Sequence, residues 1–241
     1  MYNNKFVSVV ISTFNEKASI KNFINEVEEL GIIDEVVVVN NNAEKGTDLE
    51  IKNTCAKLFY ETKQGYGYGY RKGLEKTTGD LIIMTEADGT FVPRDFLKLL
   101  IFSDDFPIVF GSRTASHAIG SGANMGLFLK WGNWFVAKII EVLFLSTQLS
   151  DVGCTTRLIS KKSLDQIKPL FKVTGSHFGL EMMLLVISTN IKYVEIPLIY
   201  NERIGQSSVT GNLYKAFKLG IVMIILVLKF WFLNLFRKYN D

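Results

Sequence analysis

Apolar runs alternate with amphipathic stretches through the N-terminal half of the chain. Runs rich in β-branched residues predict buried strands at residues 6–12, 34–39 and 81–84, with a shorter strand at 58–60. The spacing of apolar residues between them predicts helices at residues 18–30 and at about 48–56. A third helix is predicted after the glycine-rich loop, and it ends at about residue 77. Strands that alternate with helices indicate βαβ units, and therefore a Rossmann-like, mostly parallel α/β sheet with helices on its flanks.

The same alternation continues in the C-terminal half. It predicts a helix at 93–102, a strand at 108–111, a resumed α/β pattern at 151–160, a helix at 178–188 and a strand at 191–200. A polar loop rich in Arg, Gly and Ser follows at residues 201–211. These elements predict one α/β domain over residues 1–211.

Two further helical stretches are too apolar for an ordinary α/β helix. Residues 127–149 combine Trp131 and Trp134 with a wide apolar face and a narrow face that carries Lys130 and Lys138. This pattern is typical of an amphipathic helix at a membrane interface, although a core helix with an exposed stripe has the same spacing.

The tail is a second apolar helix, which we treat as a separate unit over residues 212–241. Between residues 219 and 236 its only charge is Lys229. This length is near the lower limit for crossing a bilayer, and it favours an embedded or spanning helix over one that lies flat. Basic residues stand on both sides, so the charge pattern sets no orientation.

Polar residues follow three of the predicted strands, at residues 13–16, 40–42 and 86–88. In a parallel sheet the carboxyl ends of the strands share one edge, and ligands bind outside that edge. The triplet Glu86-Ala87-Asp88 suits a hard cation such as Mg²⁺ or Mn²⁺ held against a diphosphate. Taken alone, such a triplet is more often a strand end followed by a polar turn, because acidic triplets are common in loops.

Composition narrows the range of partners. The 241 residues carry 27 Lys and Arg against 24 Asp and Glu, so the chain lacks the basic excess of a general nucleic-acid binder. Hydrophobic residues make up 48% of the chain, which points to membrane contact. The two cysteines are far apart and match no metal motif, and residues 1–5 lead directly into a strand. We therefore expect a membrane-associated protein whose catalytic domain is cytoplasmic.

Several motifs, none specific alone, occur in one familiar order. They lie at residues 9–16, 35–47, 64–79, 86–89, 111–113, 151–157, 195–197 and 203–208. In this order the chain resembles the family 2 glycosyltransferases with a GT-A fold, and among them the dolichyl- and polyprenyl-phosphate sugar transferases. The resemblance implies an inverting, metal-dependent enzyme that moves a hexose from a UDP- or GDP-linked sugar to a dolichyl or undecaprenyl phosphate.

The resemblance also implies a donor site. Its expected residues are Thr13, Asn15, Glu16, Asn40, Gln64, Gly65, Arg71, Glu86, Ala87 and Asp88. The chain departs from the family where Asn40 and Glu86 replace aspartates. We expect Asp88 to bind the metal directly and Glu86 to act on the metal through water or on the ribose. The glycine-rich stretch 64–73 has neither the P-loop nor the GxGxxG spacing, so we interpret it as a loop and helix start close to the nucleotide.

The acceptor phosphate is assigned in the same way to Arg113, Arg157, Arg203 and Ser207, because a guanidinium matches phosphate oxygens with two parallel bonds. Ser208 stands where relatives commonly have Lys. Asp88, Asp151 and Arg157 are the expected catalytic residues. An ionised phosphate attacks without a strong general base, whereas a sugar hydroxyl would need one, for which Asp151 and Glu181 are candidates.

Two other functions remain open at this stage. One is a GT-A transferase that acts on a sugar hydroxyl in polysaccharide or lipopolysaccharide assembly. The other is a membrane-attached nucleotide-sugar binder without turnover, which the replacements at positions 40, 86 and 208 would allow. The expected partners are a nucleotide sugar, a polyprenyl phosphate and a membrane, with no nucleic acid and with a homo-oligomer left open.

Overall fold

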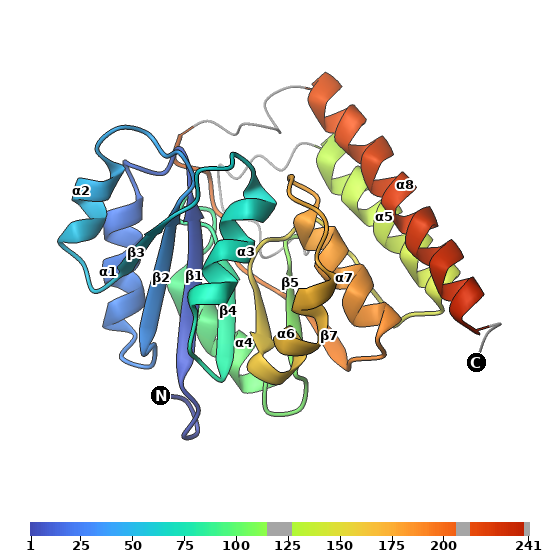
Figure 1. The fold of residues 1–241 in the computed structure, drawn as a ribbon, viewed down its shortest axis with the longest axis horizontal. Coiled ribbons are helices and arrows are strands. Elements are labelled where there is room, and N and C mark those ends of the chain that lie inside the picture. Colours follow the sequence, from blue (N-terminus) through green and yellow to red (C-terminus); the bar gives the residue numbers. More distant parts are fainter. Residues whose placement is uncertain (115–126, 206–212, 239–241) are drawn as a thin grey trace.

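The computed structural model of the protein describes residues 1–114, 127–205 and 213–238 (Figure 1). Its centre is a seven-stranded sheet in the order β3-β2-β1-β4-β6-β5-β7. The strands are β1 (Val7–Thr13), β2 (Glu35–Asn40), β3 (Lys57–Tyr60), β4 (Leu81–Thr85), β5 (Ile108–Ser112), β6 (Arg157–Ser160) and β7 (Tyr193–Pro197). Only β6 pairs antiparallel with its neighbours, β4 and β5, so the predicted mostly parallel α/β sheet is confirmed.

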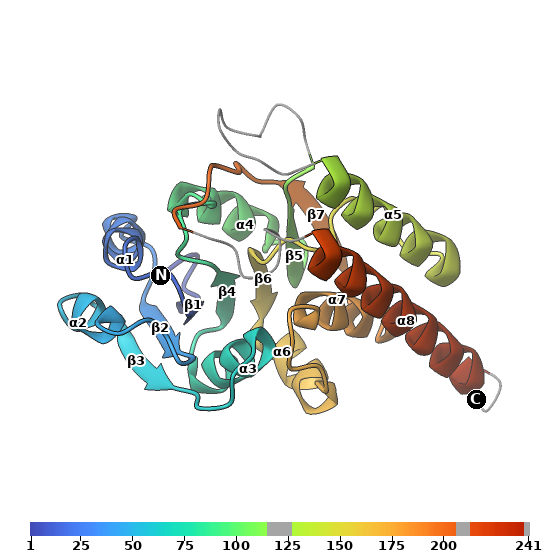
Figure 2. The same cartoon turned by 90° about the horizontal axis from the view of Figure 1, so that it is seen from above.

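Helices cover both faces of this sheet (Figure 2). They are α1 (Ile20–Glu29), α2 (Thr47–Lys52), α3 (Tyr66–Lys76), α4 (Phe96–Phe102), α5 (Leu127–Phe144), α6 (Lys161–Ile167), α7 (Phe178–Ser188) and α8 (Leu213–Lys238). Val9 belongs to the core cluster that includes α1 and α4, whereas Val10 belongs to the cluster that includes α3, α6 and α7. Because both faces are buried, the central strands are continuous apolar runs.

Two predicted helices end earlier than expected. The helix expected at 48–56 stops at Lys52, and the helix expected at 127–149 stops at Phe144, where Leu145 takes a positive φ of 50°. Side chains of α5 explain the second ending. Glu141 accepts a hydrogen bond from the backbone N–H of Leu149, and Lys138 donates one to the carbonyl of Leu149. The chain therefore folds back onto the last turn of the helix.

The apolar helices α5 and α8 run side by side along one end of the domain (Figures 1 and 2). Met223 and Val227 of α8 join the core cluster that contains Val136 and Ile140 of α5. Within the described residues, one helix is long and apolar enough to cross a membrane, with a candidate span at Ala216–Leu235 whose residues are mostly not buried. Most of α8 is thus an apolar surface that faces away from the domain.

Candidate active site

The polar strand ends meet at one edge of the sheet, as the sequence predicts. Thr13 at the end of β1 pairs in register with Asn40 at the end of β2, and Ile11 pairs with Thr85 at the end of β4. The residues that follow these strands therefore emerge next to one another. Thr13 donates a hydrogen bond to Glu16, which fixes that carboxylate beside the ends of the strands.

Asp88 is the most deeply buried of the acidic residues at this edge, with no exposed surface. Its Oδ1 accepts hydrogen bonds from the backbone N–H and the hydroxyl of Thr90. Its Oδ2 has no hydrogen-bond partner in the described part of the chain and lies in ion-pair contact with the Arg203 guanidinium. Arg203 also pairs with Glu86 at 3.4 Å and with Glu16 at 4.0 Å, so one arginine bridges three carboxylates.

Backbone contacts hold Arg203 in this place. The N–H of Ile204 donates to the carbonyl of Asp88 at 2.7 Å, and the N–H of Asn201 donates to the carbonyl of Thr90 at 2.9 Å. Gly89 has a φ of +81°, which favours glycine, and a Cβ there would lie 2.9 Å from Ile204. The turn after β4 and the segment after β7 are therefore packed directly against each other.

The charges of this cluster are unbalanced. Burial and the neighbouring Asp88 carboxylate raise the pKa of Glu86 to about 8, against the opposing effect of Arg203. Burial acts to lower the pKa of Arg203, but the carboxylates of Asp88, Glu86 and Glu16 raise it overall. A buried carboxylate oxygen that has an ion-pair contact but no hydrogen bond, beside two further acids, fits a divalent cation. Within the described residues no group of three or more His, Cys, Asp or Glu is arranged to hold a metal ion.

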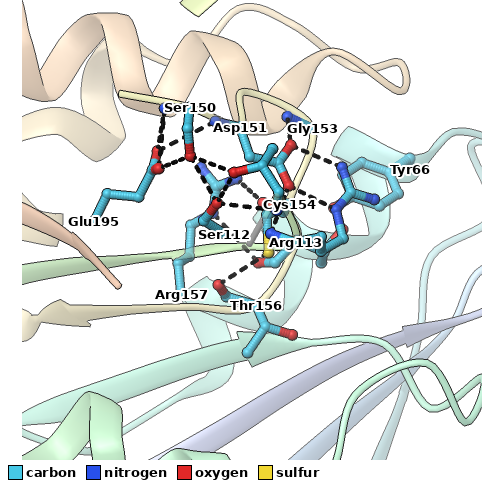
Figure 3. Close-up of polar contacts among 12 residues, drawn as sticks. Tyr66, Ser112, Arg113, Ser150, Asp151, Gly153, Cys154, Thr156, Arg157 and Glu195 are labelled. Carbon is cyan, nitrogen blue, oxygen red and sulfur yellow. Dashed lines mark hydrogen bonds and ion pairs between the residues drawn. The ribbon is translucent and has the colours of Figure 1, made fainter. Parts of the chain in front are cut away.

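A second charged group of the site is Arg113, whose side chain is held by Asp151 (Figure 3). Its Nε and Nη2 donate to the two oxygens of Asp151 at 2.8 and 2.9 Å. The backbone N–H groups of Arg113 and Gly153 donate to the same carboxylate, which leaves it fully occupied. Burial acts to raise the pKa of Asp151, but Arg113 lowers it overall. Asp151 is therefore suited to orienting Arg113 and poorly suited to act as a general base.

Arg157 is buried on β6 and has only 2% of its surface exposed. Its guanidinium donates to the backbone carbonyls of Cys154, Thr155 and Gly179 and lies 5.3 Å from the ring centroid of Phe110. Burial lowers the pKa of Arg157, and no carboxylate pairs with it among the described residues. A buried cation held only by carbonyls leaves positive charge for an anionic ligand.

A cavity of about 750 Å³ joins these groups to the apolar helices. Of the residues predicted from the sequence, eight line it: Asn15, Glu16, Gln64, Gly65, Glu86, Arg113, Arg157 and Arg203. Residues of α5 and α8 form its other end, among them Phe135, Val136, Ala216, Phe217, Met223 and Ile224. The cavity therefore runs from an acidic edge, past arginines, to an apolar wall.

Seven other predicted residues that the structure describes are not part of this lining: Thr13, Asn40, Arg71, Ala87, Asp88, Asp151 and Glu181. Thr13 is buried behind Glu16, the carbonyl of Ala87 accepts from Ser19, and Arg71 stands on α3 away from the cavity wall. Asn40 uses its amide in a local turn, donating to Asp48 and accepting from the N–H of Ala43. Ser207 lies outside the described residues. Glu181 accepts from the N–H groups of Lys172 and Val173, which is a loop-capping role.

Some residues of the site escaped the sequence reasoning. Tyr66 lines the cavity, and its hydroxyl lies 2.7 Å from that of Thr155. Asn41 shapes the loop before it, donating to the carbonyls of Glu61 and Lys63 and accepting from the N–H of Gly65. Both stand inside stretches that the sequence singled out. The glycines there serve packing, since a Cβ on Gly69 would lie 2.0 Å from the Ser12 hydroxyl.

Comparison with known proteins shows the family and the fold of the chain. The sequence model of the family described as "Glycosyl transferase family 2" matches residues 8–168. The hexosyltransferase Agl6 of low-salt glycan biosynthesis in Haloferax volcanii is 28% identical over 84% of this chain and 49% of its own length. The dolichyl-phosphate beta-glucosyltransferase ALG5C of Trichomonas vaginalis is 25% identical over 84% of this chain and 65% of its own length. The chain thus spans about half to two thirds of these two relatives.

A third relative is matched over more of its length. The UDP-N-acetylglucosamine–dolichyl-phosphate N-acetylglucosaminyltransferase of Methanococcus voltae is 23% identical over 83% of this chain and 88% of its own length.

Solved structures show the same fold. Glucosyl-3-phosphoglycerate synthase from Mycobacterium tuberculosis, in complex with Mn²⁺, UDP and phosphoglyceric acid, superposes with a TM-score of 0.71 at 14% identity, covering 95% of this chain and 79% of that one. Its complex with Mg²⁺ and UDP gives a TM-score of 0.69 at 15% identity, covering 93% of this chain and 79% of that one. The predicted GT-A fold is confirmed, and with the match over residues 8–168 the chain belongs to glycosyl transferase family 2.

Proposed function

We propose that this protein is an inverting, metal-dependent glycosyltransferase that moves a hexose from a UDP- or GDP-linked sugar to a polyprenyl phosphate at the cytosolic face of a membrane. The observation that carries the proposal is the continuous cavity from Glu86, past Arg113 and Arg203, to the apolar residues of α5 and α8. An activated sugar fits its acidic end, and a lipid phosphate fits the arginines and the apolar wall. The dolichyl-phosphate transferases among the relatives use an acceptor of this chemistry.

The donor diphosphate belongs at the acidic edge. Asp88 and Glu86 would hold Mg²⁺ or Mn²⁺ there, and the cation supplies charge neutralisation for the departing nucleoside diphosphate. Arg203 bridges these carboxylates in the structure and neutralises part of their charge. When the donor and its cation bind, the Arg203 guanidinium therefore has to move away from these carboxylates or contact them together with the cation.

The acceptor phosphate belongs next to Arg113. An oxygen of the ionised phosphate attacks C1 of the sugar, and the bond from C1 to the donor diphosphate breaks with its electron pair on the diphosphate. The attack comes from the face opposite the leaving group, which inverts the configuration at C1. Because a phosphate monoester is ionised at neutral pH, no side chain has to remove a proton. The commitment of Asp151 to Arg113 agrees with this chemistry better than with a hydroxyl acceptor.

The proposal has a direct test in purified protein. A panel of nucleotide sugars is incubated with Mn²⁺ and a polyprenyl phosphate, and nucleotide release is measured with and without the lipid. We expect release from one donor to depend on the lipid, and a product that extracts into organic solvent and is labile to mild acid. Asp88→Asn should remove transfer while the protein stays folded.

Other outcomes would contradict the proposal. Lipid-independent transfer to a sugar hydroxyl, giving an acid-stable product, would favour the polysaccharide or lipopolysaccharide reading. The absence of sustained nucleotide release with every donor and acceptor would favour a binder without turnover. Full activity of Asp88→Asn would overturn the metal assignment.

A further inference from the structure

Glu195 on β7 holds the loop that carries Asp151, although it does not line the cavity (Figure 3). Its two carboxylate oxygens accept from the backbone N–H of Ser150 at 2.9 and 3.0 Å, and one of them also contacts the Ser150 hydroxyl. The N–H of Asp151 adds a longer bond at 3.3 Å. One carboxylate therefore collects three donors from two consecutive residues.

The loop held in this way is the one that fixes Arg113. Asp151 follows Ser150 and binds the Arg113 side chain through both oxygens. The Ser150 hydroxyl also lies 2.8 Å from that of Ser112 and 2.7 Å from that of Thr114, the residues on either side of Arg113. The arginine is thus anchored through its side chain and through both of its neighbours.

One nitrogen of the Arg113 guanidinium is not used by Asp151. Its Nη1 makes no hydrogen bond to any residue that the structure describes, and the residue lines the cavity. The ring of Tyr200 lies 5.5 Å from the guanidinium carbon. Since Nε and Nη2 are bound to Asp151, the direction of Nη1 depends on where the loop places that carboxylate.

We propose that Glu195 is a positioning residue for the acceptor: by holding Ser150 and Asp151 it orients Arg113 toward the phosphate that the cavity receives. This inference rests on the proposed function. In Glu195→Gln one acceptor oxygen becomes an NH₂ group, which confronts the N–H donors of the loop and releases at least one of them. The shape and volume of the side chain stay almost the same.

The test uses the full chain with farnesyl phosphate as a soluble acceptor. For Glu195→Gln we expect the KM for farnesyl phosphate to rise about tenfold, the cost of losing hydrogen bonds to a charged group. The kcat and the KM for the nucleotide sugar should stay unchanged, because the donor edge is built by other residues. A purely structural role would lower the active fraction, and hence kcat, without selecting one substrate.

Glu35→Gln provides the matched control. Glu35 is a buried carboxylate on β2 that accepts from the Ser8 hydroxyl and from the Thr78 N–H, and it does not line the cavity. This variant should lower the melting temperature as Glu195→Gln does, and leave both KM values at their wild-type level. Equal KM values for farnesyl phosphate in wild-type and Glu195→Gln proteins would overturn the proposal.

A double-mutant cycle with Arg113→Lys separates this inference from the proposed function. A lysine cannot form the forked pair with Asp151, so Glu195→Gln should add no further rise in the KM for farnesyl phosphate in that background. If wild-type protein uses neither farnesyl phosphate nor the polyprenyl phosphate, the proposed function is wrong. The same cycle in thermal unfolding then decides the positioning role: non-additive melting temperatures support it, and additive ones overturn it.

Discussion

At the scale of single residues, Arg203 occupies the position that best suits a cation. Its guanidinium contacts Asp88 and pairs with Glu86 and Glu16 in the donor-free protein. A divalent ion bound by these oxygens would therefore have to compete with the Arg203 guanidinium. The arginine offsets part of the negative charge of the cluster, which lowers the cost of burying Asp88.

The first prediction concerns this competition. Arg203→Gln should increase the affinity of the donor-free protein for Mn²⁺ on the order of tenfold, because a charge-assisted contact to Asp88 is removed. The binding is measured by titration with Mn²⁺ in an electron paramagnetic resonance cell. Asp88→Asn should abolish the binding, and Arg94→Gln, on the exposed surface, should leave it unchanged. Equal affinities of wild-type and Arg203→Gln would refute the competition.

The second prediction concerns the buried pair of Asp151 and Arg113. Asp151→Asn should lower the free energy of unfolding by about 3–5 kcal/mol, because it leaves the buried guanidinium without its charge partner. The pKa of Asp151 is lowered in the folded state, so its contribution is complete above the ordinary pKa of an aspartate and is lost as the pH falls through the lowered value.

Urea unfolding as a function of pH measures this effect. The difference between wild-type and Asp151→Asn should be constant above about pH 5 and shrink in more acidic solution. Asp165→Asn is the control, since Asp165 is 51% exposed and pairs only with lysines on the surface. A difference that grows as the pH falls would contradict the assigned ion pair.

At the scale of elements, α8 has two unlike faces. Ala216, Met223 and Val227 are buried toward the domain, at spacings of seven and four residues. On the other side Ile225 and Phe232 are 59% and 51% exposed, with the exposed Lys229 near them. Such a helix, about 39 Å long at 1.5 Å per residue, suits an apolar stripe in contact with lipid.

The third prediction tests this stripe without touching the cavity. Ile225→Glu combined with Phe232→Glu should reduce binding to liposomes about tenfold or more, because each exposed side chain contributes apolar area to lipid contact. Co-sedimentation measures the binding. The paired control is Leu49→Glu with Ile101→Glu, which adds the same charge to exposed positions on α2 and α4. Equal loss in both double variants would contradict a specific membrane face.

The elements also show what the sequence could reveal. The hydrophobic pattern predicted the sheet, because strands follow from local periodicity. It also predicted that Glu16, Asn40 and Glu86 lie at the same edge of the sheet, because the strands that precede them pair in parallel. The end of α5 at Phe144 was not predictable, since it depends on contacts of Glu141 and Lys138 with Leu149. The sequence pattern of residues 145–149 predicts that the helix continues through them.

In the site, too, contacts between residues far apart in the chain could not be predicted from the sequence. The three arginines were singled out by residue type, but nothing local indicates that Arg203 reaches Asp88 or that Asp151 binds Arg113. Both pairs depend on how loops far apart in the chain pack together. Tyr66 was missed because an aromatic residue in a glycine-rich stretch carries no signal of a cavity wall.

At the scale of the whole molecule, one cavity connects the polar edge of the sheet with the apolar helices. The carboxyl edge of the sheet, the loop that carries Arg113 and the paired helices α5 and α8 all contribute to its wall. Under the proposed function, this arrangement would place a water-soluble donor and a lipid acceptor at opposite ends of one cavity. The predicted domain 1–211 and the tail 212–241 would then act together, since α8 closes the acceptor end.

The most direct measurement follows a labelled hexose. Purified protein in liposomes that contain a polyprenyl phosphate is given the nucleotide sugar, labelled in the sugar, that supports nucleotide release. The proposed function predicts label in the organic phase as a mild-acid-labile polyprenyl phosphate sugar with inverted configuration, and none with Asp88→Asn. Label that stays in water-soluble glycan, or that reaches lipid equally with Asp88→Asn, would contradict it.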